Sequence, residues 1–197
     1  MSAPDGAVPG EALAGLSLAS LPADIIELAA LRERTQVLKA LAARRGLGFP
    51  AVGWIAAARD TLLLCVRPER WLLLSAPGPP GSTLSLWRGP CIGCAAVVEL
   101  SSGLTALHLA GPAVSDVLAR SCRLDLYPEA FVPGSAAATS MAQVSVILAR
   151  LPGGWLLLTP SSTARHLREW LAATARPFGL LERGNVNVAA LSGEGTA

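Results

Sequence analysis

Apolar and polar positions near the middle of the chain predict a strand followed at once by a helix. Residues 104–109 form a β-rich apolar run. Pro112 suits the first turn of a helix, where its missing N–H costs little. Val114, Val117 and Leu118 then fall at helical spacing, which gives that helix one apolar face. The segment therefore predicts an amphipathic helix that follows a buried strand.

The same patterns predict two hairpins and three further helices. A short apolar run at residues 24–31 fits a strand or the start of a helix, because brief runs carry no clear period. Ser161 or Ser162 is placed to cap the last helix, and Pro177 lies beyond its end. The other predicted strands are 61–66, 71–75, 95–100, 138–150 and 155–159, and the predicted helices are about 31–46, 83–87 and 162–175.

The two hairpins resemble each other in sequence. The segment 70–75 reads RWLLLS and 154–159 reads GWLLLT, and in each case a second tryptophan follows on the next predicted helix. A duplicated unit explains this similarity. The predicted fold class is α+β, with two tandem split-βαβ (ferredoxin-like) halves whose antiparallel sheets carry helices on one face. We expect a flexible leader at 1–20, halves at 21–101 and 102–183, and a flexible tail at 184–197.

Composition limits the classes of function. Hydrophobic residues make up 52% of the chain and charged residues 15%, so an unusual amount of apolar surface must be covered by a core or a partner. The net charge of +2 comes from scattered residues, which argues against a nucleic-acid surface. No apolar run reaches the roughly 18 residues of a membrane span. The N-terminus does not resemble a secretory signal, which points to the cytoplasm.

Few residues carry recognisable chemistry. Cys91 and Cys94 form a C-x-x-C pair, a spacing found in zinc sites, in redox dithiols and among small buried residues. His108 and His166 lack a Cys or His at ligand spacing, and the alternation around His108 predicts a place at the surface or an interface. Asp125 lies between two leucines and is expected to satisfy a turn. We assign no catalytic, cofactor-binding or metal residue to the chain.

An ordered set of motifs across residues 30–180 resembles the gamma subunit of heterotetrameric sarcosine oxidase. The block from 122 to 134, C-x-L-D-L-x-P followed by F-x-P-G, is the most specific part. One departure is Pro160-Ser161-Ser162-Thr163, where the family usually shows Pro-Arg-Ser-Phe. The other matching motifs are E-L-S-S-G from Glu99, L-x-L-x-G-P from Leu107, V-L at Val117, Thr139, R-W-L-L-L from Arg70 and W-L at Trp170.

The resemblance implies a non-catalytic subunit with a structural or assembly role in a complex that oxidatively demethylates sarcosine to glycine. The one-carbon unit would pass to tetrahydrofolate or leave as formaldehyde, with hydrogen peroxide as the second product. The resemblance also implies alpha, beta and delta subunits as partners. FMN, FAD-like or NAD groups, tetrahydrofolate and zinc would bind to those partners, and no cofactor would bind to this chain. No nucleic-acid or membrane partner is expected.

Three alternatives stay open. A related complex would act on another N-methyl amino acid. The family is also distantly similar to folate-binding domains of the glycine-cleavage T-protein, so a stand-alone folate-binding protein is the second alternative. Ser140–Val146 matches the T-protein strand that carries carboxylates but contains no acid, which argues against aminomethyl transfer. The third alternative is a thiol or zinc site at Cys91 and Cys94.

Overall fold

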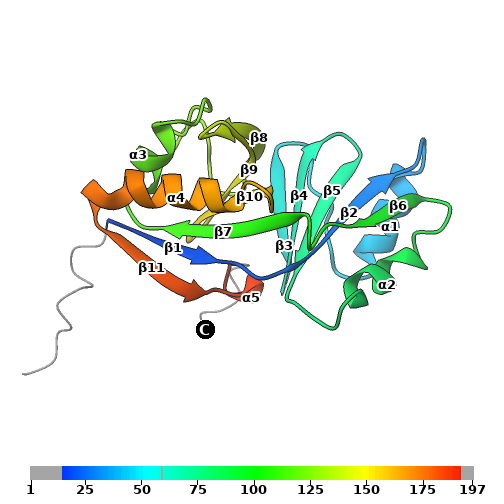
Figure 1. Cartoon of the computed structure of the whole chain (residues 1–197). Helices are drawn as coiled ribbons and strands as arrows, with labels where there is room; N and C mark the ends of the chain where they lie inside the picture. The colour runs from blue at the N-terminus through cyan, green and yellow to red at the C-terminus, as the bar shows by residue number, and fades with distance from the viewer. Residues whose placement is uncertain (1–14, 59, 192–197) are drawn as a thin grey trace, which may run out of the picture.

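The computed structural model describes residues 15–58 and 60–191 and has an α+β fold, as the sequence predicts (Figure 1). The six-stranded sheet contains β1 (Leu16–Ser20), β7 (Leu104–Ala110), β8 (Ala136–Met141), β9 (Val144–Leu151), β10 (Gly154–Pro160) and β11 (Leu180–Asn185), in the order β11-β1-β7-β10-β9-β8. The five-stranded sheet contains β2 (Asp24–Ala30), β3 (Trp54–Ala58), β4 (Thr61–Arg67), β5 (Arg70–Ser75) and β6 (Ala95–Glu99), in the order β3-β4-β5-β2-β6. Neighbouring strands are antiparallel except β1 and β11.

Helices cover one face of each sheet, and the other faces pack on each other. The cores under the helices involve α3 (Val114–Ala119) and α4 (Ala164–Ala175) on the six-stranded sheet, and α1 (Thr35–Ala43) and α2 (Ser82–Arg88) on the five-stranded sheet. Figure 1 shows these two helix layers on opposite parts of the molecule. A third core lies between the sheets, and the short α5 (Val188–Leu191) contributes Val188 to it.

Inner strands are buried on both faces. On β4, Leu62 and Leu64 join the core between the sheets, whereas Leu63 joins the core under α1 and α2. On β5, Leu72 joins the core between the sheets and Leu73 joins the core under α1 and α2. A strand that is covered on both sides favours apolar residues at successive positions, which explains the consecutive leucines of both hairpins.

The predicted leader and tail are too long. Residues 16–20 form β1, which lies between β7 and β11, and Leu16 and Leu18 are fully buried. At the other end, β11 and α5 extend through residues 184–191. Both segments are ordered by pairing and packing with distant residues, which local composition does not reveal. The rest of the predicted leader and tail, 1–14 and 192–197, lies outside the described residues.

The single predicted strand at 138–150 is also wrong, because two strands occupy this region. A tight turn joins β8 to β9, and its central residues Ala142 and Gln143 have φ angles of 49° and 65°. Two successive left-handed residues are the signature of a type I′ hairpin turn. Such turns usually contain Asn or Gly, so the turn is not visible in a sequence where apolar alternation continues through it.

Several boundaries differ from those predicted. The ambiguous run at 24–31 forms strand β2, and β3 was not predicted. Helix α1 begins only at Thr35, because Glu33 has a left-handed φ of 61°. Helix α4 begins after Thr163 without a side-chain cap, so the predicted serine cap is wrong. The remaining predicted strands and helices are found within a few residues of their expected ends.

Gly154 has no room for a side chain, because a Cβ at this position would meet the Leu109 carbonyl oxygen and lie 2.7 Å from Nε2 of His108. We expect Gly154→Ala to lower the free energy of unfolding by about 2 kcal/mol, since the strand backbone opposite cannot move away. Urea denaturation measures this change. Gly153→Ala is the matched control, because nothing lies within 4 Å of a Cβ at that position. Equal losses in the two variants would contradict the explanation.

Candidate functional site

Cys91 and Cys94 lie in the core under α1 and α2. Their exposed fractions are 0% and 2%. Burial raises the pKa of the Cys91 thiol to about 11, and the neighbouring Cys94 thiol adds to the increase. A thiol with such a pKa is almost entirely protonated at neutral pH, whereas reactive and metal-binding cysteines are thiolates. Within residues 15–58 and 60–191, no group of three or more His, Cys, Asp or Glu is placed to hold a metal ion.

We predicted that His108 lies at the surface or at an interface, and because the residue is buried the surface position is wrong. Its exposed fraction is 8%, and Nε2 has no hydrogen-bond partner within the part of the chain that the structure describes. The neighbours Leu107 and Leu109 face the core under α3 and α4, as the alternation indicates. The prediction failed because it treated the opposite face of the strand as open, whereas both faces of β7 are covered. Burial disfavours the charged imidazolium and lowers the pKa of His108.

Two other polar residues that the sequence analysis named, His166 and Asp125, contact turns. Nε2 of His166 lies 3.0 Å from the carbonyl oxygen of Ala142, in the β8–β9 turn. A carboxylate oxygen of Asp125 accepts a hydrogen bond from the Tyr127 N–H at 3.0 Å, which confirms its predicted role in a turn. Ser140–Val146 forms the β8–β9 turn and its flanks rather than an uninterrupted strand.

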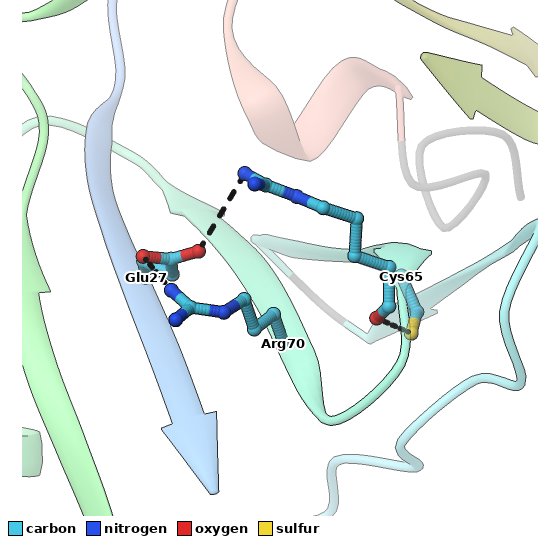
Figure 2. Close-up of polar contacts among 4 residues, drawn as sticks. Glu27, Cys65 and Arg70 are labelled. Atoms are coloured by element: carbon cyan, nitrogen blue, oxygen red, sulfur yellow. Dashed lines mark hydrogen bonds and ion pairs between the residues drawn. The ribbon is translucent and has the colours of Figure 1, made fainter.

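An ion-pair cluster on the five-stranded sheet was not found by sequence reasoning. The carboxylate of Glu27 lies 3.2 Å from the Arg70 guanidinium and 4.0 Å from that of Arg67 (Figure 2). The Cys65 thiol donates a hydrogen bond to the Arg67 carbonyl oxygen at 3.2 Å, which helps fix the end of β4. The registers of β2 against β5 and of β4 against β5 bring these charges together. Because the side chains of Arg67 and Arg70 are 67% and 50% exposed, the cluster contributes little to stability.

A cavity of about 510 Å³ lies between the end of α1 and α2. Arg44 and Arg45 line it, together with hydroxyl groups from Thr61, Ser75 and Thr83. The Arg45 guanidinium lies 5.0 Å from the centre of the Trp87 ring. Asp60 is the one carboxylate in this lining, which contains no histidine or cysteine. The lining therefore lacks a pair of groups suited to general acid–base chemistry.

These features define an α+β protein made of two face-packed sheets, each with its own helix layer. Residues 35–176 match the model of the sarcosine oxidase, gamma subunit family. The chain is 35% identical over 147 residues to sarcosine oxidase subunit gamma of Corynebacterium sp. (strain U-96), covering 73% of this chain and 71% of that protein. It is 36% identical over 144 residues to the subunit from Arthrobacter sp., covering 71% and 70% of the two chains. The chain belongs to the sarcosine oxidase gamma subunit family.

Solved structures agree with this assignment. A chain of heterotetrameric sarcosine oxidase from Corynebacterium sp. U-96, in complex with pyrrole 2-carboxylate, matches with a TM-score of 0.76 and 30% identity over 88% of this chain and 90% of that chain. The glycine cleavage system aminomethyltransferase T from Bartonella henselae matches with a TM-score of 0.65 and 18% identity over 90% of this chain and 49% of that chain. The second likeness shows a shared fold.

Thiol labelling tests the burial of the cysteines. We expect Cys122, the half-buried thiol, to react with iodoacetamide in the folded protein before Cys65, Cys91 and Cys94, which are buried. Raised pKa values of Cys65 and Cys91 slow their reaction further. Mass spectrometry of peptides identifies the labelled thiols, and labelling in denaturant serves as the control. Rapid labelling of Cys91 in the folded chain would contradict the buried arrangement.

Burial of His108 predicts a pH dependence of stability. Burial holds the pKa of folded His108 below its ordinary value of 6.5, so the unfolded chain binds a proton first as the pH falls. The free energy of unfolding should therefore be constant with respect to this group above about pH 6.5 and decrease below it. Urea denaturation from pH 7.5 to 5.5 measures the slope. His108→Leu should flatten it, and an unchanged slope would show that another group is responsible.

Proposed function

We propose that this chain is a non-catalytic subunit with an assembly role in a heterotetrameric sarcosine oxidase complex. The observation that carries the proposal is the match over 88% of this chain to a chain of such a complex. The gamma subunits of two further organisms support it at comparable identity. The protonated, buried Cys91 thiol is consistent with a structural rather than a chemical role for the C-x-x-C pair.

The partners in this proposal are the alpha, beta and delta subunits. They carry the FMN, FAD-like or NAD, tetrahydrofolate and zinc sites, and together they convert sarcosine to glycine. The one-carbon unit goes to tetrahydrofolate or leaves as formaldehyde with hydrogen peroxide. The absence of an acid in Ser140–Val146 supports the placement of one-carbon chemistry on other subunits. Another N-methyl amino acid as substrate would leave the role of this chain unchanged.

We also propose that the two sheets descend from one duplicated split-βαβ unit. In the five-stranded sheet, β6, β2, β5 and β4 follow one another, with helices α1 and α2 in the two crossovers. The equivalent strands of the six-stranded sheet are β11, β7, β10 and β9, with helices α3 and α4. The same relative order supports the duplication, and β1 is then an insertion between the first and last strands of the second unit.

Co-expression tests the proposed function. We expect the chain to co-purify with the alpha, beta and delta subunits encoded in the same genome, in a complex that oxidises sarcosine. Size-exclusion chromatography and an assay of glycine formation measure assembly and activity. Flavin absorbance should follow the complex and be missing from this chain when it is purified alone.

Two results would contradict the proposal. Failure of the chain to bind any of the three subunits would remove the assembly role. Binding of tetrahydrofolate to the isolated chain, measured by calorimetry, would favour a stand-alone folate-binding protein of the T-protein type, the fold that the chain shares.

A further inference from the structure

The free edge of β6 differs from the other sheet edges. β3 and β8 meet where Trp54 bridges to Ser135, so these two edges partly cover each other. The β11 edge carries charged residues, including Glu182, which pairs with Arg168 at 2.7 Å. Charges on an edge strand discourage pairing with other chains. β6, with the sequence AAVVE, has no charge before its last residue and no such protection.

The register of β6 shows which of its backbone groups are free. In an antiparallel ladder, alternate residues direct both N–H and C=O to the partner strand. The Leu100 N–H donates to the Ile25 carbonyl oxygen, and the Leu31 N–H donates to the Cys94 carbonyl oxygen. Cys94 and Leu100 thus direct backbone groups toward β2, and by alternation Val98 between them does the same. The backbone groups of Val97 and Glu99 therefore point outward. Among the described residues, β6 pairs with β2 alone, which leaves these groups without a strand partner.

The side chains around this edge are suited to an interface. Val98 is 46% exposed, and Val97 is partly buried against the core under α1 and α2. Ile92, just before the strand, is 80% exposed. Leu31, whose N–H donates a hydrogen bond to Cys94 next to the first residue of β6, is 44% exposed. Soluble proteins rarely leave an apolar surface next to unpaired strand groups, because it recruits other chains.

We propose that β6 is a docking edge for an extended segment of another subunit, which adds a sixth strand to the five-stranded sheet. The outward N–H and C=O groups of Val97 and Glu99 would hydrogen-bond with this segment, as in other cases of strand addition. Apolar side chains of the segment would pack beside Val97 and Val98, and a cation would suit Glu99. This inference rests on the proposed function, in which one copy of the chain is present and the strand comes from a different subunit.

Val97→Pro is the direct test in the co-expressed complex. Proline removes the outward N–H and leaves the ladder to β2 intact, and edge strands tolerate it where the N–H faces solvent. We expect its affinity for the partner subunits to fall about tenfold or more, the effect of one hydrogen bond left unmade. Val97→Thr is the matched control, because it keeps the N–H and the β-branched shape. Its affinity should stay within about twofold of the original.

Hydrogen exchange gives a second readout that needs no variant. The amides of Val97 and Glu99 should exchange much more slowly in the complex than in the free chain, while the already paired Val98 amide changes little. Ala96→Lys, which places a charge on an exposed side chain of β6, should also weaken assembly.

The outcomes separate this inference from the proposed function. If the complex forms but the two amides stay unprotected and Val97→Pro assembles normally, the docking edge is wrong and the assembly role stands. If the free chain forms a dimer that Val97→Pro dissociates, the occupant is a second copy and the proposal is overturned. If the original chain binds no other subunit, both proposals fail.

Discussion

The packing of the two sheets against each other is the constraint on which the rest of the structure depends. Leucines of β4 and β5 meet those of β9 and β10, so each sheet has helices on one side and a second sheet on the other. The inner strands of such a sandwich of four layers are covered on both faces and therefore favour apolar residues on both. The runs LLLC and WLLL follow directly from this position, as does the burial of His108 on a face that would otherwise be open.

This arrangement changes the meaning of the high hydrophobic content. Apolar residues in excess of an ordinary core indicated either a large interior or a partner, and the core between the sheets accounts for much of that excess. Composition therefore says little about assembly. The proposed partner surface consists instead of a few exposed positions near β6, where backbone groups and side chains are both uncovered. Local geometry distinguishes a large interior from a partner surface, and residue counts do not.

Sequence patterns predicted the elements whose signals are local. Both hairpins were recognised because apolar runs end at turn residues such as Pro68 and Gly153, and the helices because their apolar faces recur at regular spacing. β1 was missed because it is ordered by pairing with residues far away in the sequence: Leu18 pairs with Leu109, 91 positions later, and Leu16 with Leu180, 164 positions later. The Glu27 ion pairs were missed for the same reason. The ordered motifs identified the family.

β1 also determines how the two halves relate. It precedes the first half in sequence, yet it lies between β7 and β11 in the sheet of the second half. The short link from Ser20 to Asp24 therefore passes from one sheet to the other beside the core that both share. Each end of this link is fixed by a ladder of hydrogen bonds, which restricts movement of one sheet against the other. A strand bound at β6 would thus be held in a fixed orientation relative to both halves, which is what an assembly subunit requires.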